Sequence, residues 1–197
     1  CIRDRLNPEH PPLIKDLSAI PLLFMKLNFP LKSPSWTEEI NGQWNIGPEF
    51  LYHSGNNADK IIFWSRIPEI FLMLLLGFYI YKWAKELFDK KTGLLALFFY
   101  AFSPTIIAHS RLVTTDLGAA CFMFIATYYF IKFLKKPSWK TALISGITFG
   151  VAQLTKFSCI LLLPFFAILV ILAIFISPAN FLFTLKDWLK RAKKFIG

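Results

Sequence analysis

Between two long apolar runs lies a short polar stretch, His109-Ser110-Arg111-Leu112-Val113-Thr114-Thr115-Asp116. A carboxylate at the end of a membrane-spanning helix is costly to keep near hydrocarbon, so Asp116, with Arg111 close by, is a candidate functional residue. The alternative is that Asp116 only caps the following helix, because Asp is a preferred N-cap residue. The stretch therefore predicts a turn between two spanning helices and a candidate site at that turn.

The composition indicates an integral membrane protein. Of 197 residues, 55% are hydrophobic and 17% are charged, whereas a soluble domain is about 25% charged. The formal net charge of +10 predicts no nucleic-acid partner, because Lys and Arg gather at the ends of apolar runs, where membrane orientation places them. Three cysteines without C-x-x-C spacing favour neither a disulfide framework nor a zinc site.

Five apolar runs predict an all-α fold, a polytopic bundle of five transmembrane helices over residues 67–177. The runs cover residues 67–81, 92–108, 117–134, 141–155 and 159–177. Residues 1–66 are predicted to form an extracytoplasmic loop with a juxtamembrane helix, and residues 178–197 a cytoplasmic amphipathic basic helix. Lysines after the first and third runs place those two turns in the cytoplasm. We expect a multi-pass protein of the cell (inner) membrane.

The predicted outer face holds several polar residues besides Asp116. Paired prolines precede the juxtamembrane helix, which should kink at Pro21, because a proline ring clashes with the carbonyl group four residues earlier. Glu9 and His10 stand before this helix and could bind a metal or a phosphate, or simply be solvated. Arg66, at the outer end of the first run, could bind a lipid-linked phosphate or extend to lipid headgroups.

Four sequence elements occur in order along the chain: His10-Pro11-Pro12-Leu13, Arg66-x-Pro68, Pro104 with Arg111 and Asp116, and Thr155-Lys156. Together they resemble family 39, the protein-mannosyltransferase-like glycosyltransferases of the GT-C class. They are also similar to the bacterial aminoarabinose transferases of lipid A. The resemblance extends from about Pro8 to Pro164. It implies a membrane enzyme that moves a hexose or pentose from a polyprenyl-phosphate donor to a lipid or protein acceptor on the outer face.

The resemblance also implies roles for individual residues. Asp116 would be the catalytic residue of this part of the site, and would orient the acceptor or bind a divalent metal ion. Three basic residues would bind the donor phosphate, namely Arg66, Arg111 and Lys156. Three further residues would line the pocket or bind the metal ion, namely Glu9, His10 and His109.

The first acidic pair of such enzymes, which includes the expected catalytic base, has no counterpart in this sequence. Glu38-Glu39 lies on the wrong side of the paired prolines to replace it, so we expect that an N-terminal part is missing. Two other functions stay open at this point. One is a transporter or flippase for a polyprenyl-linked lipid, which would typically carry polar residues in the middle of its spans. The other is a noncatalytic membrane scaffold.

Overall fold

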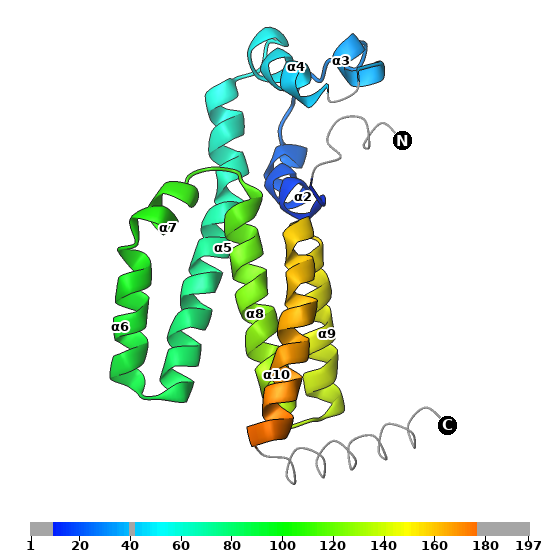
Figure 1. Cartoon of the computed structure of the whole chain (residues 1–197). Coiled ribbons are helices and arrows are strands. Elements are labelled where there is room, and N and C mark those ends of the chain that lie inside the picture. The colour runs from blue at the N-terminus through cyan, green and yellow to red at the C-terminus, as the bar shows by residue number, and fades with distance from the viewer. Residues whose placement is uncertain (1–9, 40–41, 177–197) are drawn as a thin grey trace.

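The computed structural model describes residues 10–39 and 42–176. Within these ranges every regular element is a helix and no strand occurs, which confirms the predicted all-α class. Long helices lie side by side, and short helices gather at one end of them (Figure 1). Glu9 and the predicted basic helix at residues 178–197 lie outside the described residues.

Three helical segments of the described chain are long and apolar enough to cross a membrane. They are α5 (Ala58–Leu87), α8 (Thr115–Lys135) and the segment Phe157–Ile176, which joins η3 (Phe157–Leu161) to α10 (Leu162–Ile176). Two shorter helices, α6 (Lys90–Ala101) and α9 (Trp139–Gln153), connect these three segments and run in the opposite direction. At 12 and 15 residues they are about 18 and 22 Å long, against a hydrocarbon core of about 30 Å. The number of membrane passes stays a prediction.

Both short return helices begin at a side-chain cap. Asp89 accepts a hydrogen bond of 2.7 Å from the backbone amide of Thr92 at the start of α6. Ser138 accepts one of 3.1 Å from the amide of Thr141 at the start of α9, and the Thr141 hydroxyl accepts one from the Ser138 amide. Such caps satisfy amides that have no partner within the helix. They define the two tight turns at the predicted cytoplasmic end.

The first predicted span differs from the structure at its start. α5 begins at Ala58 rather than at residue 67, because Asn57 caps it by accepting a hydrogen bond of 3.0 Å from the Lys60 amide. A helix of 30 residues is about 45 Å long, some 15 Å more than the hydrocarbon core. The turns of α5 that precede Arg66 can therefore extend beyond the membrane.

The second predicted span, residues 92–108, is not one helix. α6 ends at Ala101, and the separate helix α7 (Pro104–His109) follows. Proline disfavours the helical conformation in the residue before it and has no amide to donate. Ser103 accordingly has an extended backbone, with φ −68° and ψ 118°.

One end of the bundle is covered by α2 (Leu13–Ala19), which continues into η1 (Ile20–Phe24). We call it the outer end, after the orientation that the sequence predicts, and the opposite end the inner end. The change from α-helix to a 3₁₀ turn at Pro21 confirms the predicted break. Farther out lie three short helical elements, α3 (Pro34–Thr37), α4 (Gln43–Pro48) and η2 (Glu49–His53). In Figure 1, α2, α7 and the start of α8 share one end of the bundle, opposite the α5–α6 and α8–α9 turns.

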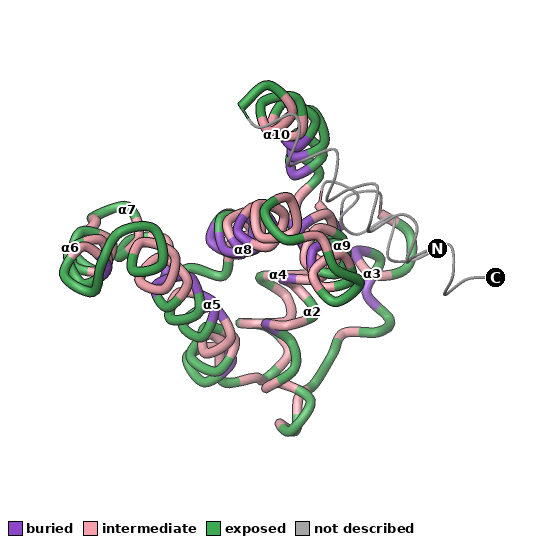
Figure 2. The backbone as a smooth tube through the Cα atoms, turned by 90° about the horizontal axis from the view of Figure 1, so that it is seen from below, coloured by how far each residue is buried: buried purple, intermediate pink, exposed green. Residues whose placement is uncertain are grey.

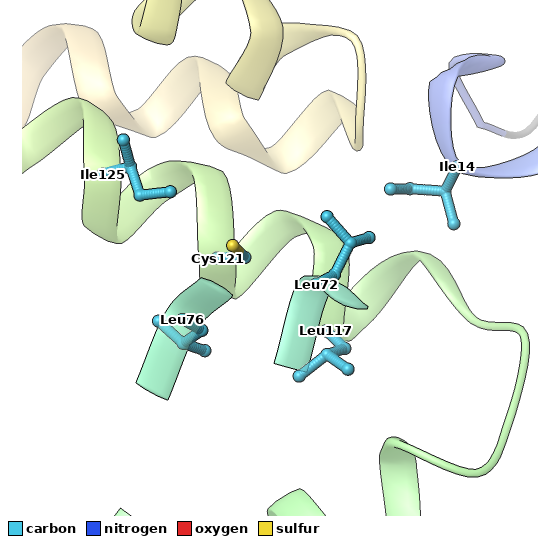
Figure 3. Close-up of a cluster of buried hydrophobic side chains, with 6 residues drawn as sticks. All are labelled: Ile14, Leu72, Leu76, Leu117, Cys121 and Ile125. Atoms are coloured by element: carbon cyan, nitrogen blue, oxygen red, sulfur yellow. The ribbon is translucent and has the colours of Figure 1, made fainter. Parts of the chain in front are cut away.

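Two small apolar cores hold the described helices together. The first contains Ile14, Leu72, Leu76, Leu117, Cys121 and Ile125, and joins α2, α5 and α8 (Figure 3). The second joins α8, α9 and α10, where the Phe130 and Phe166 rings stack with centroids 4.0 Å apart. Figure 2 shows buried residues where the helices face one another and exposed residues on the outer sides of α6 and α10. Many of the exposed residues are Phe, Leu and Ile, as expected of helices that face lipid.

Candidate functional site

An ion pair joins the start of α8 to the junction between α9 and η3 at the outer end of the bundle. The ammonium group of Lys156 donates a hydrogen bond of 2.6 Å to Oδ1 of Asp116, across 40 positions of sequence. Asp116 lies in the first turn of α8, and the N-cap position of that helix falls on Thr114. Asp116 is therefore not the cap residue. The side chains of Asp116 and Lys156 are 52% and 30% exposed, so both remain accessible from outside.

The position of Lys156 is fixed by the junction between α9 and η3. Thr155 is fully buried, and its hydroxyl donates a hydrogen bond of 2.6 Å to the carbonyl oxygen of Ala152. The side-chain amide of Gln153, through Nε2, donates one of 2.9 Å to the carbonyl oxygen of Cys159 and so joins the end of α9 to η3. Lys156 itself is extended, with φ −155° and ψ 141°. Its side chain can therefore leave the turn and reach the start of α8.

Two histidines accompany this ion pair. The imidazoles of His10 and His109 both interact electrostatically with the Asp116 carboxylate. In each of them Nδ1 is buried and has no hydrogen-bond partner among the described residues. His10 comes close because the Leu13 amide donates a hydrogen bond of 3.2 Å to the carbonyl oxygen of Leu154, next to Thr155. Elements from three distant parts of the sequence thus meet at Asp116.

The two arginines lie differently. Arg66 lines a cavity of about 430 Å³ between α2, α5 and the Leu112-Val113 stretch. Arg111, which precedes that stretch, is exposed and makes no hydrogen bond or ion pair with another described residue. Of the predicted site residues, the structure brings together Asp116, Lys156, His10 and His109. Arg66 occupies a neighbouring cavity.

One buried acidic residue was not selected from the sequence. Glu69 of α5 is fully buried, and neither carboxyl oxygen has a hydrogen-bond partner in the described structure. The sequence could have indicated Glu69, because it lies inside the apolar run 67–81. An acidic residue in a membrane-spanning segment is a functional candidate by default.

The described residues do not by themselves make a metal centre. Among residues 10–39 and 42–176, no group of three His, Cys, Asp or Glu side chains could hold a metal ion. Asp116 with His10 and His109 therefore falls short of such a set. The divalent metal ion therefore stays a prediction.

Comparison with known proteins identifies the family of the chain. The family model of dolichyl-phosphate-mannose-protein mannosyltransferases matches residues 57–191, well over half of the chain. The match includes both Asp116 and Lys156 but begins after α2 and His10. No curated protein and no solved structure matches the chain, and the similarity to aminoarabinose transferases stays a prediction. The chain is an integral membrane protein and belongs to the dolichyl-phosphate-mannose-protein mannosyltransferase family, whose members are membrane glycosyltransferases of the GT-C class.

Proposed function

We propose that this chain carries part of the active site of a glycosyltransferase that moves a sugar from a polyprenyl-phosphate donor to an acceptor on the outer face of the membrane. The observation that carries the proposal is the ion pair between Asp116 and Lys156 at the outer end of the bundle. Exposed ion pairs contribute only about 0–1 kcal/mol to stability. Folding therefore depends little on this pair, whereas both charges are accessible to a ligand.

The transfer replaces one bond to the anomeric carbon by another. The bond from this carbon to the phosphate oxygen breaks, and the polyprenyl phosphate leaves with the bonding electrons. A bond forms to the acceptor oxygen, whose proton passes to the acidic pair that the resemblance implies for such enzymes. Negative charge develops on the departing phosphate, and stabilisation of developing charge is often the largest catalytic contribution.

The ion pair leaves atoms free for this chemistry. A lysine ammonium group has three N–H donors, and one of them binds Oδ1 of Asp116, so two remain for phosphate oxygens. Oδ2 of Asp116 can accept a hydrogen bond from the acceptor hydroxyl. In this proposal Lys156 and Arg111 neutralise the phosphate, and Asp116 orients the acceptor. His10 and His109 interact electrostatically with the same carboxylate.

Asp116→Asn tests the proposal, because Asn has nearly the same size but no charge. We expect sugar transfer to fall by about a hundredfold or more, with expression and thermal stability unchanged. Transfer is measured in membranes with a protein that includes both this chain and the acidic pair implied by the resemblance, from polyprenyl-phosphate donors that carry a hexose, mannose first, or a pentose. Glu86→Gln is the matched control, because Glu86 also pairs with a lysine but lies at the opposite end of the bundle. Its transfer should be unchanged.

Two results would contradict the proposal. If the Asp116→Asn variant transferred sugar at the wild-type rate, the turn would have only a structural role. Absence of transfer from every donor by a wild-type protein that includes this acidic pair would favour the scaffold or the transporter.

A further inference from the structure

Glu69 is a buried acidic residue that the proposed transfer does not use. It is fully buried in α5, and both of its carboxyl oxygens lack a hydrogen-bond partner in the described structure. Buried polar groups in native proteins are nearly always hydrogen-bonded, and each exception requires an explanation. Ser18 and Thr114 also carry a buried hydroxyl without a partner. Unsatisfied polar atoms of the described chain therefore gather toward one end of the bundle.

The register between α5 and α8 places the backbone of Glu69 opposite the first turns of α8, where its carboxylate interacts electrostatically with Cys121. Leu72 Cδ1 lies 3.7 Å from the position that a Cβ on Gly118 would take. Both helices run from the outer end toward the inner end (Figure 1). Glu69 precedes Leu72 by one helical turn on α5. One turn before Gly118 on α8 is the turn that begins at Thr115 and contains Asp116.

A cavity lies one helical turn outward from Glu69. Ser65 and Arg66 precede Glu69 by four and three positions, so the three residues share one side of α5. Ser65, Arg66 and Ser18 line the cavity of about 430 Å³ between α2 and α5. The cavity thus combines the basic side chains of Lys15 and Arg66 with two hydroxyl groups among mainly apolar lining residues. Glu69 does not line it but lies one helical turn away on the same side of α5. This combination suits a ligand with both a phosphate and sugar hydroxyls.

We propose that Glu69 is a sugar-binding residue, whose carboxyl oxygens accept hydrogen bonds from hydroxyl groups of the sugar on the lipid-linked donor. The phosphate of that donor lies toward the cations of the outer end, with Arg66 nearest to the sugar. Because no partner holds the Glu69 carboxyl group, its rotation toward the cavity breaks no hydrogen bond. This inference rests on the proposed function, since it assumes a lipid-linked sugar as the ligand.

Binding of two lipids to the detergent-solubilised full-length chain separates the sugar from the phosphate. The probes are dolichyl-phosphate-mannose and dolichyl phosphate without sugar. Glu69→Met, which has similar volume but no hydrogen-bonding group, should bind the sugar-bearing lipid about tenfold more weakly and the bare lipid as the wild type does. Arg66→Gln should weaken binding of both lipids. Glu86→Gln, on the same helix but at its inner end, should change neither.

Thermal unfolding distinguishes a ligand contact from a structural role. Because the Glu69 carboxyl group has no partner to lose, Glu69→Met should unfold at the wild-type temperature or above. If Glu69→Met does not fold, Glu69→Gln replaces it, because Gln keeps the volume but offers only one accepting oxygen. About threefold weaker binding of the mannose lipid is then expected.

Each outcome has one meaning. Wild-type affinity of the Glu69 variants for the mannose lipid would overturn the inference and leave the proposed function standing. Equal weakening for both lipids, together with a lower unfolding temperature, would also overturn it and indicate a structural residue. If the wild-type chain bound neither lipid, the proposed function would fail together with the inference.

Discussion

The backbone amide of Leu13 donates a hydrogen bond of 3.2 Å to the carbonyl oxygen of Leu154 and joins α2 to the end of α9. The next residue, Ile14, packs against Gly118 of α8. Leu154 precedes Thr155-Lys156, and Gly118 follows Asp116 by two positions. The surface helix α2 therefore contacts the supports of both members of the ion pair, which makes the packing of α2 a condition for the site.

Packing of α2 can be tested at Gly118. A Cβ at this position would overlap Cδ1 of Ile14 and lie 2.8 Å from its Cγ1, and overpacking of this kind typically costs about 1–3 kcal/mol. We expect Gly118→Ala to lower the unfolding temperature in detergent. In an Ile14→Ala background the same substitution should have little effect, because the obstructing atoms are gone.

Gly146→Ala is the control for this experiment. No atom lies within 4 Å of the Cβ that this substitution adds, and alanine is favoured over glycine inside a helix by roughly 0.5–1 kcal/mol. Stability should be unchanged or slightly higher. If Gly118→Ala behaved in the same way, the close packing of α2 on α8 would be wrong.

Lys156→Ala should affect ligand binding more than stability. With its side chains 52% and 30% exposed, the Asp116–Lys156 pair should contribute no more than about 1 kcal/mol to folding. Loss of one charge-assisted contact to a phosphate costs roughly 1.5–3 kcal/mol, or about ten- to a hundredfold in affinity. Isothermal titration with dolichyl phosphate and thermal unfolding measure the two effects separately.

Lys132→Ala is the matched control for Lys156→Ala. Lys132 forms an ion pair of 3.1 Å with Glu86, with side chains 41% and 37% exposed, at the inner end. Its removal should leave the affinity for dolichyl phosphate unchanged. Equal losses of affinity in both variants would show that the effect is general rather than local to Asp116.

Tyr128→Phe should destabilise the inner end of the bundle. The Tyr128 hydroxyl is buried and donates to both carboxyl oxygens of Glu86, at 2.9 and 3.0 Å. A hydrogen bond to a charged group contributes about 1.5–3 kcal/mol, and one between neutral groups about 0.5–1.5 kcal/mol. Tyr100→Phe, which loses a bond of 2.8 Å to the Met73 carbonyl oxygen, should therefore cost less in thermal unfolding. The reverse order would contradict a charged Glu86 at this position.

The helical class and the ends of α8 and α9 could be predicted, because apolar runs and their flanking charges depend on local sequence alone. Asp116 and Lys156 could be selected for the same reason, since both stand at the end of an apolar run. Their pairing at 2.6 Å depends on how α9 and η3 join, which no local pattern specifies. The early start of α5 was missed because the Asn57 cap precedes the apolar run.

Which residues are buried was harder to predict from the sequence than which residues are helical. Glu69 becomes buried only because α8 packs on its side of α5, and Ile14 only because Gly118 leaves room for it. Both facts depend on the register between helices that are distant in sequence. The division of residues 92–108 into two helices at Pro104, by contrast, could be predicted from the sequence, because the residue before a proline is seldom helical. The run was nevertheless read as one helix because it is apolar throughout.

The last prediction concerns orientation in the membrane. A set of lysines lies at the ends of α5 and α8 and at the starts of α6 and α9, opposite α2, namely Lys85, Lys90, Lys91, Lys132, Lys135, Lys136 and Lys140. Because Lys and Arg are enriched in cytoplasmic turns, this end should face the cytoplasm and the Asp116–Lys156 pair the outside. In a Cys1→Ser background, a membrane-impermeant maleimide should label Leu112→Cys in intact cells and Lys136→Cys only after permeabilisation. Cys121 and Cys159 are fully buried and should stay unlabelled in both cases. Labelling of Lys136→Cys in intact cells, with Leu112→Cys protected, would place the ion pair on the cytoplasmic side and contradict transfer on the outer face.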